Sequence, residues 1–140
     1  MRLFLFACAA VFLFSCGGKN AEKHPSNVGR SGNQECAMMK FEQTSSDFGE
    51  VAQGEKVVLF YTFENAGGSD LVIYEAIPSC GCTSPKFDES PVKPGEKRTV
   101  EVTFDSDGWS GKQQKSITFK TNGVPDYTTI LLSGTVTSFK

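Results

Sequence analysis

Apolar and polar residues alternate with a period of two through much of the chain after residue 40. The clearest run, residues 57–64, reads Val-Val-Leu-Phe-Tyr-Thr-Phe-Glu and is rich in β-branched and aromatic residues. Successive side chains of a strand point to opposite faces, so this period predicts a strand with one buried face. Similar runs predict strands near residues 41–45, 71–77, 99–104, 117–121 and 130–136. We also expect Phe48 and Val51 to pack on the core.

Short turn-forming segments separate these runs, at residues 65–69, 94–96, 105–108 and 122–123. Their glycine, proline, asparagine and aspartate residues favour the backbone conformations of tight turns. Short strands with regular turns, and no helical period, predict an all-β domain: an antiparallel β-sandwich of about seven strands, with a closed barrel as the alternative. The single Trp109 is expected to pack over an edge of this sandwich.

The first 16 residues carry a different pattern. Arg2 precedes an unbroken apolar run over residues 3–14, which is shorter than the roughly 20 residues that a membrane-spanning helix needs. A positive start and a short apolar core are typical of a signal peptide. The following Leu-Phe-Ser-Cys resembles a lipobox, which predicts cleavage before Cys16 and its acylation. An ordinary cleaved signal peptide, with Cys16 incidental, is the alternative.

The expected organisation therefore has three parts. Residues 1–15 form a lipoprotein signal peptide, 16–40 the lipidated cysteine with a flexible tether, and 41–140 the β-sandwich. The tether is inferred from a composition of Gly, Ser, Asn, Lys and Glu. Several acyl chains on Cys16 would hold the protein on a bacterial membrane of the cell envelope.

Charge and histidine content narrow the function classes. The chain has 14 Lys and Arg against 16 Asp and Glu, which gives no reason to invoke nucleic acid as a partner. Its one histidine, His24, lies in a polar stretch, so histidine-based metal sites and Ser-His-Asp or Cys-His catalysis are disfavoured. We therefore expect a protein that is not an enzyme.

The cysteines leave one thiol over. Of the five, Cys8 would leave with the signal peptide and Cys16 would carry lipid. Cys36, Cys80 and Cys82 remain, an odd number, so at least one must be free, bound to metal or paired outside the chain.

Residues 79–83, Ser-Cys-Gly-Cys-Thr, form the main candidate site. Cys80 and Cys82 could form a disulfide, expected to be strained and labile because the Cα atoms should lie near the upper end of the usual range. They could instead bind Cu(I), with Cys36, Met38 and Met39 completing the site, since soft sulfur ligands suit that ion. They could also be small buried residues that shape a loop. Met38 and Met39 could equally fill the core of a first strand.

Several segments together resemble a bacterial family of unknown function, domain of unknown function fifteen-seventy-three. They are Asp-Phe-Gly-Glu-Val at 47–51, Phe-Glu-Asn-Ala-Gly at 63–67, Ser-Cys-Gly-Cys-Thr at 79–83, Val-Lys-Pro-Gly-Glu at 92–96, Lys-Thr-Asn at 120–122 and Ile-Leu-Leu-Ser-Gly-Thr-Val at 130–136. The resemblance implies an immunoglobulin-like β-sandwich, akin to major-sperm-protein and cilia-associated domains, on an exported protein or lipoprotein of Bacteroidota or related bacteria. The family carries no agreed role for its cysteine pair. In some proteins that this chain resembles, an acidic run just after the lipidated cysteine directs the protein to the cell surface. Here only Glu22 lies close after Cys16, so the resemblance favours the periplasmic face of the outer membrane.

Two interpretations of function follow. The first is a membrane-anchored lipoprotein whose domain binds or scaffolds a protein partner in the envelope, without catalysis and without a cofactor. The second is thiol-redox chemistry or Cu(I) binding through Cys80 and Cys82.

Overall fold

The computed structural model describes residues 36–138, which form eight β-strands. In chain order they are β1 (Met39–Phe41), β2 (Ser45–Ala52), β3 (Lys56–Asn65), β4 (Ile73–Pro78), β5 (Thr83–Lys86), β6 (Lys97–Asp105), β7 (Gly111–Thr121) and β8 (Tyr127–Thr137).

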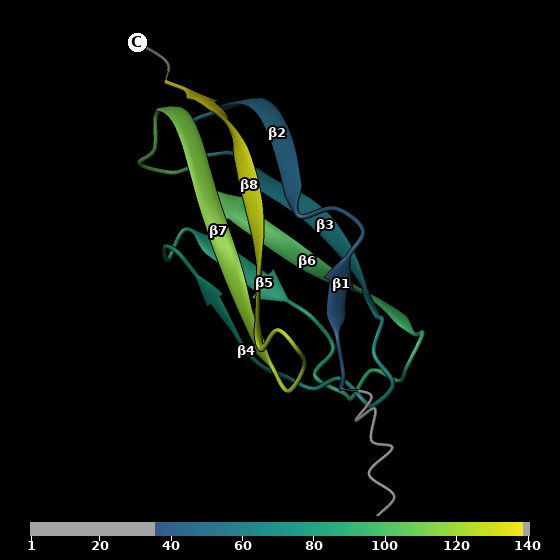
Figure 1. Ribbon diagram of the computed structural model, residues 1–140. Helices are drawn as coiled ribbons and strands as arrows, with labels where there is room; N and C mark the ends of the chain where they lie inside the picture. The colour runs from purple at the N-terminus through teal and green to yellow at the C-terminus, as the bar shows by residue number, and fades with distance from the viewer. Residues whose placement is uncertain (1–35, 139–140) are drawn as a thin grey trace, which may run out of the picture. The chain divides into compact units, whose positions relative to one another are not determined.

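The strands form two four-stranded sheets, in the orders β1-β3-β6-β5 and β2-β8-β7-β4. Figure 1 shows the sheets as two layers, with β4, β7 and β8 in one and β3, β5 and β6 in the other. The prediction of a β-sandwich is confirmed. Two details differ from the sequence prediction: there are eight strands, and β2 pairs with β8 in parallel while the other strand pairs are antiparallel.

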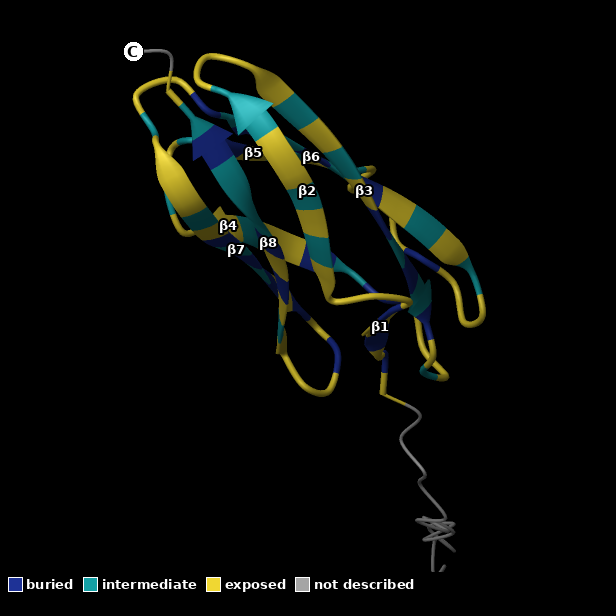
Figure 2. Cartoon of the chain, turned by 90° about the horizontal axis from the view of Figure 1, so that it is seen from above, coloured by how far each residue is buried: buried dark blue, intermediate teal, exposed yellow. Residues whose placement is uncertain are grey.

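The core lies between the two sheets. Along β3, β6, β7 and β8 buried residues alternate with more exposed ones, as the coloured bands of Figure 2 show. The largest side chains that are fully buried are Tyr61, Phe63, Phe104, Phe119, Leu71, Ile117, Ile130 and Leu132. The predicted period of two therefore reports the packing of one strand face against the opposite sheet.

The outer strands of both sheets are short or irregular. β1 has three residues and β5 has four. Pro85 in β5 lacks an N–H to donate. Register shifts interrupt β2 between Asp47 and Glu50 and β4 between Ile73 and Glu75. None of the four edges therefore offers a long regular ladder for another strand.

Gly49 explains why the residues of β2 do not alternate regularly between apolar and polar. Gly49 has φ 74°, a left-handed conformation that favours glycine, and lies within the register shift. Phe48 and Val51, three residues apart, consequently both pack against the core, as predicted, although strict alternation would put them on opposite faces.

The folded domain begins before residue 41. Ala37 and Met39 are 1% and 4% exposed and belong to the core. Cys16, the signal peptide and most of the predicted tether lie outside the described residues. Among the described residues, we find no helix long and apolar enough to cross a membrane.

Candidate functional site

The first candidate site is a disulfide where the chain passes from β4 in one sheet to β5 in the other. Cys80 and Cys82 are bonded, with Cα atoms 5.2 Å apart. This separation is inside the common range of roughly 4.4–6.8 Å and not near its upper end. The expectation of widely spaced Cα atoms, on which the predicted strain depended, was wrong because the chain turns tightly between the two residues.

Backbone hydrogen bonds fix this turn. The amide and the hydroxyl of Thr83 both donate to the Cys80 carbonyl, at 3.4 and 3.3 Å. The Cys82 carbonyl accepts from the Asp105 amide at 2.9 Å. Gly81 is exposed, its φ is not left-handed, and a Cβ added there would meet nothing within 4 Å. Neither the backbone conformation nor crowding by neighbours therefore requires glycine at position 81.

A buried cation lies at the same corner. Lys115 of β7 is 9% exposed and is the only charged residue among the described ones that is classed as buried. Its Nζ lies 3.3 Å from the centroid of the Trp109 ring, an arrangement typical of a cation–π contact. Loss of hydration lowers the pKa of Lys115. Trp109 packs against the core at the sandwich edge, as expected from the sequence.

The other sulfur residues do not join this corner. Cys36 and Met38 lie near Asn65, where β3 ends and β6 begins, whereas Cys82 contacts the last residue of β6. The two places lie at opposite ends of β6, whose nine residues span roughly 26 Å, eight steps of about 3.3 Å. Met39 is in the core, and Cys36 is exposed and free.

The structure therefore does not bring together the ligands of the combined copper site that the sequence suggested. In the disulfide, neither sulfur is available as a thiolate ligand. No cluster of three or more His, Cys, Asp or Glu suited to a metal ion occurs within residues 36–138.

The second candidate site is a hollow of about 380 Å³ on the outer face of the β3–β6–β5 sheet. Its lining residues are Phe60, Lys86, Phe87, Asp88, Thr99 and Glu101. Phe60 is 60% exposed in the middle of β3, and Phe87 packs edge-on against Phe119 of the core at 6.2 Å between ring centroids. Lys86 and Glu101 face each other in the β5–β6 register, so their opposite charges balance.

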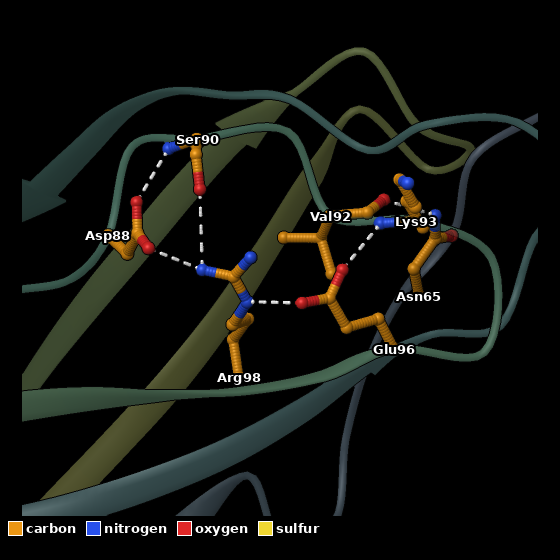
Figure 3. Close-up of polar contacts among 7 residues, drawn as sticks. All are labelled: Asn65, Asp88, Ser90, Val92, Lys93, Glu96 and Arg98. Carbon is orange, nitrogen blue, oxygen red and sulfur yellow. Dashed lines mark hydrogen bonds and ion pairs between the residues drawn. The ribbon is translucent and has the colours of Figure 1, made fainter.

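An ion-pair network holds one side of this hollow (Figure 3). Arg98 of β6 bonds both Asp88, which lines the hollow, and Glu96 at 2.7 Å. Backbone donation from Ser90 is the main cause of a lowered pKa at Asp88, and donation from Lys93 has the same effect on Glu96, with Arg98 contributing to both. The network fixes residues 88–96 against β6.

Asn65 anchors the other end of the same loop. Its side-chain amide donates to the carbonyls of Val92 at 2.9 Å, as Figure 3 shows, and of Ser69 at 2.8 Å. Its side-chain carbonyl accepts from the amides of Met38 at 3.2 Å and Gly67 at 3.1 Å. Asn65 is fully buried, and these four bonds satisfy its side chain.

Sequence reasoning missed Phe60 and Lys115 as candidates. The signal for Phe60 was an aromatic residue on the polar phase of the strand at 57–64. The signal for Lys115 was the alternation that puts Ile117 and Phe119 in the core, because the same phase extended by one step reaches a lysine.

A family model described as a protein of unknown function, DUF1573, matches residues 39–136. A search of curated proteins found no match. Among solved structures, a protein of unknown function from Porphyromonas gingivalis W83 superposes with a TM-score of 0.64 at 17% identity, covering 78% of this chain. The present chain spans 51% of that protein, about half its length.

A second solved structure defines the kind of sandwich. The ASH/PapD-like domain 7 of human CEP192 superposes with a TM-score of 0.58 at 14% identity, over 76% of this chain and 89% of that one. At such low identity the likeness shows the fold alone, and that fold is a PapD-like, immunoglobulin-like β-sandwich.

Proposed function

The chain belongs to DUF1573, a family of proteins of unknown function, and from that premise we propose that it is a lipid-anchored binding module of a bacterial envelope. The lipobox-like sequence ending at Cys16 supports the anchor, and the single acidic residue close after it, Glu22, supports the periplasmic face of the outer membrane. The domain would bind a protein partner without catalysing a reaction.

Phe60 is the observation that carries the binding role. A phenylalanine that is 60% exposed contributes little to the core of the domain, and the hydrophobic effect favours its burial against a partner. It lies beside a hollow whose second aromatic side, Phe87, is fixed on the core by Phe119. Large apolar side chains in preformed hollows are typical anchors of protein interfaces.

The charges around the hollow indicate what it binds. Lys86 is opposite Glu101, and Asp88 is paired with Arg98, so no strong net charge is left to attract an ion. We propose that the occupant is an apolar side chain, aromatic or branched, on an extended segment of an envelope protein. Polar residues flanking that side chain would meet the charged rim.

Site-specific crosslinking in the intact envelope tests this role. A photoreactive phenylalanine analogue replaces Phe60 in the lipidated chain, and a matched variant carries it at Tyr127, an exposed aromatic residue of the other sheet. We expect one discrete protein adduct at position 60 and none at 127, and Phe60→Thr should abolish co-purification of that protein with unchanged stability. No adduct at position 60, or the same adducts at both positions, would contradict the proposal.

The anchor is tested separately. The wild-type chain should carry labelled fatty acid and enter the detergent phase on phase separation, and Cys16→Ser should do neither. Equal partitioning of the two chains would leave an ordinary signal peptide as the better interpretation.

A further inference from the structure

Lys115 lies on β7, and the disulfide follows the end of β4, the strand that pairs with β7. Ser79 donates its amide to the Ser116 carbonyl at 2.8 Å, and the Ser116 amide donates back to the Ser79 hydroxyl at 3.0 Å. Cys80 and Lys115 are each one residue beyond this pair, and paired antiparallel backbones are roughly 5 Å apart. The backbone of Lys115 is therefore next to that of Cys80, and its side chain extends to the Trp109 ring at the same end of the sheet.

The turn that carries Trp109 adjoins the same corner. It follows Asp105, whose amide bonds the Cys82 carbonyl, and the Trp109 ring lies under the ammonium of Lys115. The Asp105 carboxylate pairs with Lys56 at 3.2 Å. Within the described residues, Lys115 forms no ion pair with a carboxylate, so its charge is available to a new anion.

The disulfide contributes little as a structural crosslink. In the chain-entropy view, stabilisation grows with the logarithm of the closed loop, and this loop contains only Cys80, Gly81 and Cys82. Both cysteines are half-buried, and the space around Gly81 is open, so a reactant can approach from solvent. A weak crosslink beside an unpaired cation needs an explanation other than stability.

We propose that Cys80–Cys82 is a reversible thiol–disulfide exchange centre that accepts electrons from a dithiol protein, and that Lys115 stabilises its reduced form. A thiolate of the dithiol attacks Sγ of Cys82, and the S–S electron pair leaves on Sγ of Cys80. In this proposal the Lys115 ammonium stabilises the Cys80 thiolate electrostatically, and the Thr83 hydroxyl lies 3.8 Å from its sulfur.

A second step completes the exchange. The second thiolate of the dithiol protein attacks the mixed disulfide at its own first sulfur and releases Cys82, which takes a proton. The partner leaves as a disulfide, and Cys80 and Cys82 remain as a thiolate and a thiol, so two electrons have moved. This activity uses none of the residues that line the Phe60 hollow and does not depend on the binding role.

The test measures the thiol–disulfide equilibrium of the mature chain in a Cys36→Ser background, which removes the exposed free thiol. Folded protein is equilibrated at pH 8 with glutathione mixtures, trapped with an alkylating agent and weighed intact. We compare Lys115→Met with Lys120→Met, an exposed lysine on the same strand, and with Lys115→Arg, which keeps the charge. Thiolate absorbance at 240 nm gives the lowest thiol pKa of each reduced chain.

We expect reversible reduction without unfolding in the wild type, Lys120→Met and Lys115→Arg. Lys115→Met should need about ten times more reducing glutathione, react about ten times more slowly with a small dithiol, and show a thiol pKa raised by about one unit, because a nearby cation is lost. Equal values for Lys115→Met and Lys120→Met would overturn the role of Lys115. A wild-type disulfide that opens only when the chain unfolds would overturn the exchange centre, even if Lys115→Met fails to fold.

Discussion

The Asn65→Ala substitution removes four hydrogen bonds from one fully buried side chain. A typical bond contributes about 0.5–1.5 kcal/mol net, so four give about 2–6 kcal/mol. The bond to the Val92 carbonyl is wholly buried and the other three are partly buried, so water can replace some of the lost partners. We therefore expect a loss of about 3–4 kcal/mol in the free energy of unfolding, which corresponds to a melting temperature lower by roughly 12–30 °C.

Urea unfolding followed by the fluorescence of Trp109, the single tryptophan, measures this loss. Asn122→Ala is the matched control, because Asn122 also bonds through both side-chain atoms, to Val72 and Asp70, but in exposed positions. We expect that control to cost about 1 kcal/mol or less. If the two variants lose the same free energy, the assignment of Asn65 as the anchor of the loop over residues 88–96 is refuted.

Four further substitutions, one of them a control, test the architecture. Gly67→Ala should unfold at clearly lower urea concentration, by about 1–3 kcal/mol, because its Cβ would lie 2.1 Å from a backbone oxygen, whereas Gly81→Ala, with open space, should match the wild type. Tyr61→Phe removes the hydroxyl that donates to a β8 carbonyl at 2.7 Å and should cost about 1 kcal/mol in calorimetry. Arg98 helps hold the pKa of Glu96 in the folded state below its value in the unfolded chain. The contribution of the Arg98–Glu96 pair to the free energy of unfolding is therefore present above about pH 4.3 and is lost as pH falls through the folded-state pKa. Arg98→Met should thus differ from the wild type at pH 7 more than at pH 3.

The regular strands could be predicted because apolar and polar residues alternate along them in step with buried and exposed positions. β3 and the core-facing phases of β6, β7 and β8 were all visible in the sequence for that reason. β2 and β5 were not, because β2 is interrupted at Gly49 and β5 is a four-residue strand containing Pro85. Parallel pairing of β2 with β8 depends on contacts between segments about 85 residues apart, which no local pattern encodes.

The candidate sites, too, could be predicted from the sequence only in part. The closeness of Cys80 and Cys82 follows from their spacing, so the sequence was sufficient to single them out. Whether Cys36 joins them depends on the fold, and the length of β6 keeps it away. The phase of Ile117 and Phe119 marks Lys115 as core-facing, but its contact with Trp109 depends on the fold and could not be predicted from the sequence.

The interrupted edges of the two sheets have a consequence for the lipid-anchored form that we propose for this protein. Lipid anchoring confines molecules to a plane, where encounters between copies are far more frequent than at the same amount in solution. Strand edges that pair freely would turn such crowding into fibrous assemblies. With β1 and β5 short, Pro85 lacking a donor, and β2 and β4 out of register partway along, each copy is a poor template for the next. The surface density of this chain can therefore rise without the copies joining into shared sheets.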